Sequence, residues 1–175
     1  MRIWLNAFLL IAIAALTIAV LLWRDEIAQY ASLGYPAIFV VCFLLNCGVF
    51  GLSPSGLVAI QMSYVYDPLI VPLVAGLGAG LGEITSYFAG TRTAEIVHPK
   101  LEDKFSKWGP VHIGAVSFVA SFISGNVSDA IGLICGRLRK GFIAYMIGAT
   151  LAKIAKMYLL VFVAKNAVEL VGLTG

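Results

Sequence analysis

The sequence has little charge. Of its 175 residues only 12% are Asp, Glu, Lys or Arg, whereas 61% are hydrophobic and the mean hydropathy is +0.96. A soluble domain of this length could not hide so much apolar surface, because roughly half of its residues must face water. The net charge of +3 is small and dispersed, which argues against a nucleic-acid partner. We therefore expect an integral membrane protein with a single membrane domain over residues 1–175.

Cysteine and histidine are equally scarce. The three cysteines lie in apolar runs and lack the spacing of a disulfide framework or a zinc site. An intramembrane serine protease would need a histidine beside Ser53 or Ser55, but His98 and His112 fall in or beside a polar connection elsewhere in the chain. We therefore expect no metal, no cofactor and no enzymatic activity.

Three long apolar segments are predicted to be transmembrane helices. The first covers residues 3–23, and Trp4 and Trp23 bracket it as interfacial aromatics bracket a spanning helix. It is longer than the apolar region of a signal peptide and no small-residue cleavage site follows it. The other two run from Leu69 to Gly90 and from about Phe142 to Val168.

Two further apolar segments carry helix-breaking residues at their centres. Residues 37–66 are interrupted by Gly48, Gly51, Pro54 and Gly56, and residues 111–135 by Ser124-Gly125-Asn126. Non-helical backbone at membrane depth survives only where it is buried in protein or lines a wet cavity. Both segments are therefore predicted to be re-entrant hairpins, which return to the side they entered. Half-helices of about 12 residues, about 18 Å long, would reach the middle of the bilayer.

The distribution of Lys and Arg favours this topology. With two re-entrant hairpins and a cytoplasmic N-terminus, eight basic residues are cytoplasmic and two are external, as the positive-inside rule requires. If both segments spanned the membrane, the division would be four inside and six outside. The polar segment 91–110 then becomes a cytoplasmic amphipathic loop. We expect a multi-pass protein of a prokaryotic cytoplasmic membrane.

Because the hairpins enter from opposite sides, residues 37–90 and 111–168 form an inverted repeat, a common plan for transporters. A shift of 70 residues places Ser55 on Gly125, Gly78 on Gly148 and Glu83 on Lys153. The expected fold class is thus all-α, with three transmembrane helices and two opposed re-entrant helical hairpins. The alternating glycines Gly76–Gly82 allow close helix approach, which would serve an internal contact or a homodimer equally well.

Four charged residues lie at membrane depth in this topology: Glu83, Asp129, Lys153 and Lys156. Each costs about 2.5–3.5 kcal/mol at a helix centre, so we expect pairs, with Asp129 on one lysine and Glu83 on the other. Such pairs either only lock helices together or line a polar cavity that admits a lipid headgroup or a coupling proton. Helix N-termini after Pro54 and Asn126 would add N–H donors suited to phosphate.

Three stretches resemble a known family. LGEITSYFAGTR, residues 81–92, resembles a motif of the DedA membrane proteins, also called the VTT-domain or SNARE-associated Golgi family. SDAIGLICGRLR (128–139) and IGATLAKIAKMY (147–158) are similar to the second hairpin and the last helix of its short YqaA-like branch. The resemblance implies lipid-related transport, such as flipping of undecaprenyl phosphate or scrambling of phospholipids. It also implies functional roles for the matching residues Glu83, Asp129, Arg139 and Lys153.

Two functions follow as hypotheses. The first is a flippase- or scramblase-like transporter that moves lipid or lipid-phosphate between leaflets, with membrane lipids and their phosphate-bearing headgroups as partners. The alternative is a proton- or ion-coupled carrier of a small solute. The residues predicted to contact the substrate are Glu83, Asp129, Arg139, Lys153, Lys156, Ser53, Ser55 and Asn126.

Overall fold

The computed structural model of this chain describes residues 31–47, 55–92 and 99–170. Within these ranges the protein consists of helices and turns and has no strand, which confirms the all-α class. The helices are α3 (Ala31–Asn46), α4 (Ser55–Met62), α5 (Ile70–Gly82), α6 (Ile84–Arg92), α7 (Pro99–Ser106), α8 (Pro110–Ile123), α9 (Gly125–Arg137) and α10 (Phe142–Leu170). The predicted helix over residues 3–23 and the predicted hairpin tip with Ser53 lie outside the described residues.

Two helical runs are long and apolar enough to cross a membrane. α5 and α6 together cover Ile70–Arg92, 23 residues, and α10 contributes the 26-residue run Phe142–Ala167. At 1.5 Å per residue, both exceed the ~30 Å hydrocarbon core of a bilayer. The two runs pack closely at Gly80, where a Cβ atom would lie 2.5 Å from the Cα atom of Thr150.

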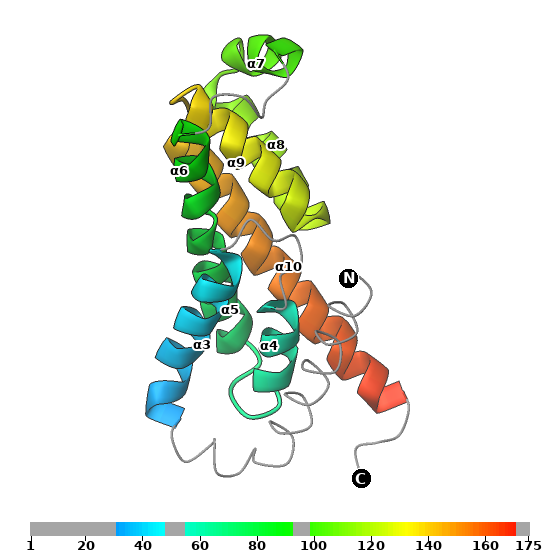
Figure 1. The fold of residues 1–175 in the computed structure, drawn as a ribbon. Coiled ribbons are helices and arrows are strands. Elements are labelled where there is room, and N and C mark those ends of the chain that lie inside the picture. Colours follow the sequence, from blue (N-terminus) through cyan, green and yellow to red (C-terminus); the bar gives the residue numbers. More distant parts are fainter. Residues whose placement is uncertain (1–30, 48–54, 93–98, 171–175) are drawn as a thin grey trace, which may run out of the picture.

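The segment from α3 to α4 starts and ends at the same end of the molecule. α3 rises from the lower end in Figure 1 and α4 descends to it. The backbone N–H of Asp67 donates a hydrogen bond to the hydroxyl of Tyr35 over 3.3 Å, and the rings of Tyr35 and Tyr66 lie 5.5 Å apart. The first half of the described chain therefore contains a hairpin at the lower end.

α8 and α9 form the corresponding hairpin at the opposite end (Figure 1). Ser124 adopts an extended conformation, with φ −153° and ψ 133°, which ends α8 and lets α9 begin at Gly125. After α9 the ammonium group of Lys140 donates to the carbonyl oxygen of Ser106 over 2.5 Å, so the exit of the hairpin lies beside its entrance. The two hairpins thus point toward each other from opposite ends.

Buried apolar side chains gather in two separate cores. The lower core joins α3, α4, α5 and the second half of α10 through Ile38, Cys42, Ala59, Tyr66, Val71, Ala75, Ala79, Met157 and Val161. The upper core joins α6, α7, α8, α9 and the first half of α10 through Tyr87, Phe105, Ile113, Ala120, Ile131, Ile134, Cys135, Tyr145, Met146 and Ala149. The two long helical runs connect the cores. Polar side chains occupy the level between the two cores.

Within the polar connection 91–110, predicted to be an amphipathic loop, the structure contains the helix α7. Its Phe105 is buried in the upper core and stacks near Trp108, with ring centroids 4.2 Å apart. Its charged side faces outward, where Lys107 and Asp103 form an ion pair whose side chains are 71% and 70% exposed. The buried Phe105 ring shows that α7 packs on the protein itself and covers one end of the upper core.

Equivalent glycines bring each hairpin against a long helix. A Cβ atom at Gly78 would collide with the carbonyl oxygen of Phe39, so α3 lies directly on α5. A Cβ atom at Gly148 would collide with the carbonyl oxygen of Gly114, so α8 lies directly on α10. Gly78 and Gly148 are 70 residues apart, and so are the first residues of α4 and α9. The glycine face of α5 therefore serves contacts within the chain, and the two halves pack in the same way.

Candidate functional site

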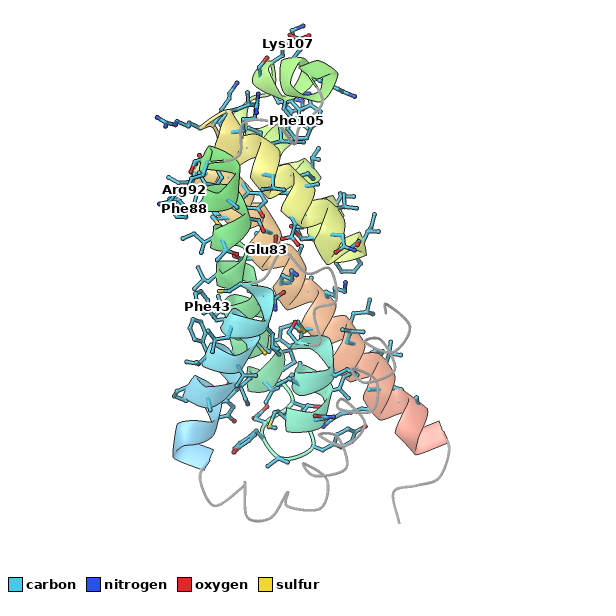
Figure 2. All side chains as sticks on the ribbon, viewed as in Figure 1. Phe43, Glu83, Phe88, Arg92, Phe105 and Lys107 are labelled. Atoms are coloured by element: carbon cyan, nitrogen blue, oxygen red, sulfur yellow. The ribbon has the colours of Figure 1, made fainter. Side chains whose placement is uncertain are left out.

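The long run formed by α5 and α6 is interrupted at Glu83. The N–H of Glu83 donates to the carbonyl of Gly80 over 3.2 Å, and the N–H of Ser86 donates to the carbonyl of Glu83 over 3.1 Å, so the backbone bonds here span three residues. The hydroxyl of Thr85 donates to the carbonyl of Gly82 over 3.0 Å and satisfies a group that the break releases. Glu83 lies near the middle of the molecule (Figure 2) and is only 2% exposed.

Glu83 forms a buried ion pair with Lys153 of α10. Lys153 Nζ lies 2.9 Å from Glu83 Oε1, and the lysine is 4% exposed. The same ammonium donates to the side-chain oxygen of Asn46 over 3.0 Å, and the amide nitrogen of Asn46 donates to the carbonyl of Cys42 over 2.8 Å. One ion pair thus joins α10 to the α5–α6 break and, through Asn46, to the end of α3. The pairing of Glu83 with one of the two lysines, expected from the sequence, agrees with this geometry.

Two hydroxyl groups, from α9 and α10, complete the coordination of Glu83, and a third hydroxyl, from α8, contacts one of them. The Tyr145 hydroxyl donates to Glu83 Oε2 over 2.9 Å, and the Ser128 hydroxyl donates to the same oxygen. Ser121 of α8 lies 2.5 Å from Ser128, oxygen to oxygen. With an ammonium on Oε1 and two hydroxyl donors on Oε2, both oxygens of the Glu83 carboxyl group are engaged.

Asp129 has a different partner from the lysine that the sequence suggested. The hydroxyl of Ser86 donates to Asp129 Oδ1 over 2.5 Å, which joins α6 to α9. Asp129 is half-buried, whereas Glu83 and Lys153 are buried. We call the set of Asn46, Glu83, Ser86, Ser121, Ser128, Asp129, Tyr145 and Lys153 the polar layer, because it lies between the two apolar cores; Tyr145 also packs in the upper core through its ring.

The other predicted site residues take varied positions. Lys156 is half-buried on α10, one turn beyond Lys153, and makes no ion pair with the described residues. Ser55 is buried at the first position of α4. Asn126 is exposed in the first turn of α9, and Ser53 lies outside the described residues.

Arg139 lies outside the polar layer. It follows the end of α9 and is ten residues, or about 15 Å along the helix direction, beyond Asp129. Its N–H donates to the carbonyl of Gly136 and the N–H of Lys140 donates to the carbonyl of Cys135, each over 3.0 Å, which is a Schellman motif. Arg139 occupies the left-handed position of that motif, with φ 48°, where glycine is favoured. The exposed guanidinium therefore belongs to the end of the bundle.

Five members of the polar layer were not predicted as site residues: Asn46, Ser86, Ser121, Ser128 and Tyr145. Ser86 is three residues from Glu83, so helical spacing could have put both on one face. Asn46 is an isolated amide in an apolar run, which is a usable signal because such groups need a partner at membrane depth. Tyr145 carries no such signal, since tyrosines are common in membrane helices.

Family profiles, curated proteins and solved structures gave no match to this chain. The resemblance to the DedA family therefore stays a prediction from its three motifs. The polar layer, in contrast, is a feature of the described residues themselves.

Proposed function

We propose that this chain is an integral, multi-pass membrane transporter of the DedA or VTT type that moves lipid or lipid-phosphate between leaflets. The observation that carries the proposal is the buried Glu83–Lys153 pair, which lies between two oppositely directed hairpins and at mid-length of two membrane-length helices. Transporters built from inverted repeats bind their substrates at this depth, where discontinuous helices meet.

The cost of the polar layer supports a functional role. By insertion scales a charged side chain costs about 2.5–3.5 kcal/mol at the centre of a membrane helix. A buried ion pair used only to join helices can often be replaced by apolar residues with no loss of stability. A layer that retains charges at the α5–α6 break, on α9 and on α10 at this depth is therefore expected to serve the passage of a polar group.

Helix ends near the layer supply further donors. α9 begins at Gly125, where a Cβ atom would lie 3.8 Å from Lys153 Nζ; α4 begins at the buried Ser55, next to Gly56, which packs on Leu160 two turns beyond Lys153. The first N–H groups of a helix have no partners within that helix and favour phosphate oxygens. A phosphate headgroup at this level would find these N–H groups and a lysine together.

Orientation forms part of the same proposal. Six basic residues lie in or directly after α6, α7 and α9, at the end drawn uppermost in Figure 1: Arg92, Lys104, Lys107, Arg137, Arg139 and Lys140. By the positive-inside rule this end and the N-terminus face the cytoplasm, in a prokaryotic cytoplasmic membrane.

A liposome assay tests the function. The purified protein is reconstituted into vesicles that carry a trace of phospholipid labelled on an acyl chain, and dithionite bleaches the label in the outer leaflet. We expect wild type to expose inner-leaflet lipid faster than empty vesicles, and Asp129→Ala to slow this movement. If neither protein moves lipid faster than empty vesicles, the lipid transport proposal fails.

A proton- or ion-coupled carrier of a small solute is the second candidate. It is favoured by Asp129, a half-buried carboxyl whose bond to the Ser86 hydroxyl permits either protonation state. Vesicles with an imposed pH gradient test it: absence of both proton flux and solute uptake counts against coupling.

A further inference from the structure

The charges at the level of the polar layer are balanced. Glu83 and Asp129 contribute two carboxyl groups, and Lys153 and Lys156 contribute two ammonium groups. The remaining charged residues of the described long helices and hairpins are Asp67, Arg92, Arg137, Lys165 and Glu169, which lie toward helix ends. With all four central groups ionised, the described part of this level has no net charge.

The four groups differ in how they are engaged. Glu83 and Lys153 are buried and bonded to each other. Asp129 and Lys156 are half-buried, and neither forms an ion pair with the described residues. The groups that remain accessible are therefore one acid, Asp129, and one base, Lys156.

Asp129 and Lys156 lie on either side of the buried Glu83–Lys153 pair. Ser86, which holds Asp129, is one turn past Glu83 in the direction of α7. Lys156 is one turn past Lys153 in the opposite direction along the molecule, because α10 runs antiparallel to α5 and α6 (Figure 1). Each turn displaces a residue by about 4.5–5 Å, so the accessible acid and base lie on opposite sides of the ion pair.

From this arrangement we propose that the ligand is zwitterionic: a phospholipid headgroup whose ammonium binds Asp129 and whose phosphate binds Lys156. This inference rests on the lipid transport proposed above and names its substrate class. A headgroup with one positive and one negative charge keeps the layer neutral when it enters. It also meets each accessible side chain with the opposite charge.

A headgroup with a net charge is disfavoured at the same place. A lipid-phosphate or an anionic phospholipid would bring a negative charge that no described group at this level is left to balance. The guanidinium of Arg139 would have been such a group, but Arg139 follows the end of α9, ten residues and about 15 Å beyond Asp129. The charge balance therefore favours zwitterionic lipids over anionic ones.

The test compares two phospholipids in the same vesicle assay. Phosphatidylethanolamine and phosphatidylglycerol are each labelled on an acyl chain, because a label on the amine would remove the ammonium. We expect wild type to move phosphatidylethanolamine at least about tenfold faster, since an unbalanced charge at this depth is costly. Asp129→Asn leaves the layer with one net positive charge and should reverse the preference. Lys156→Gln should slow phosphatidylglycerol further.

Matched substitutions at the exposed pair on α7 serve as controls. Asp103→Asn and Lys107→Gln make the same chemical changes far from the layer and should leave the ratio of the two rates at the wild-type value. Gel filtration in detergent identifies any variant that fails to fold. If Asp129→Asn does not fold, Lys156→Gln tests the same charge balance by removing a positive charge instead of a negative one.

The outcomes separate the two proposals. Movement of both lipids at equal rates, with a ratio that neither variant changes, overturns the zwitterionic ligand and leaves lipid transport standing. Movement of neither lipid above empty vesicles overturns lipid transport itself. A third arm uses radiolabelled glycerophosphoethanolamine, the same headgroup without acyl chains. Its uptake without lipid movement would assign the site to a soluble zwitterion and overturn the lipid form of the inference.

Discussion

The Glu83–Lys153 ion pair offers the sharpest test of the described architecture. Glu83→Gln removes the negative charge and leaves Lys153 with Asn46 as its described partner. Lys153→Met removes the positive charge and leaves Glu83 with the hydroxyls of Tyr145 and Ser128. The double variant removes both charges and leaves a neutral layer at that point.

The expected energies follow from the burial of both groups. Removing one partner of a buried ion pair costs about 3–5 kcal/mol, because the other charge stays buried without compensation. Lys153→Met should fall at the lower end, since two hydroxyls still donate to Glu83. The double variant should cost no more than either single one. The interaction energy between the two positions is then at least about 3 kcal/mol.

The measurement is a double-mutant cycle in detergent micelles. Unfolding by sodium dodecyl sulfate is followed by tryptophan fluorescence for wild type, both single variants and the double variant. The exposed pair Asp103–Lys107 provides the control cycle, with the same replacements to neutral residues. Its interaction energy should stay below about 0.5 kcal/mol, as for exposed helix pairs. Additive losses at Glu83 and Lys153 would refute a coupled buried pair at the centre of the fold.

Three further predictions concern the frame around the layer. Arg139→Gly should raise the free energy of unfolding by about 0.5–1 kcal/mol in a denaturation series, because glycine adopts φ 48° without strain; a loss of stability would contradict the left-handed turn. Gly148→Val should prevent α8 from packing on α10 and abolish a monodisperse peak in gel filtration, whereas Gly109→Ala, with no atom within 4 Å of the added methyl, should not. Single cysteines at positions 36 and 67, in a background without native cysteines, should react with an impermeant reagent from the same side of the membrane, and labelling from opposite sides would exclude the first re-entrant hairpin.

The helix boundaries and the charged positions around the polar layer were largely predictable, because local sequence features determine them. The helix-breaking residues at 124–126 predict a turn, and the structure ends α8 and begins α9 there. The 70-residue shift that matches Gly78 with Gly148 also matches the starts of α4 and α9. Charges within apolar runs are easy to recognise from their cost, which singled out Glu83 and Lys153.

The partners within the layer were harder to predict, because they depend on how segments meet in space. Asp129 was expected to bind a lysine, but the approach of α6 to α9 gives it the hydroxyl of Ser86. No proline marks the helix break at Glu83 in the sequence, although Gly82 precedes it. Helical spacing fixes which residues share a face, whereas the neighbour of that face is decided by the packing of distant elements.

The predicted repeat offers a reason why the four central charges divide into two kinds, one buried pair and two half-buried groups. Residues 80 and 150 are equivalent under the shift of 70, and α5 and α10 contact each other at these two positions. Glu83 and Lys153 are also equivalent, and they too contact each other. Equivalent residues touch only near the axis that relates two halves, so this ion pair lies where both halves contribute alike.

Asp129 and Lys156 break that equivalence. The same shift matches Asp129 with Ala59, a buried residue of the lower core, and matches Lys156 with Ser86. The equivalent positions, Ala59 and Ser86, carry no charge. The packing shared by the two halves therefore requires neither Asp129 nor Lys156. The two accessible charges of opposite sign are therefore additions of one half only, and an asymmetric ligand with a positive and a negative end is the partner that would use both.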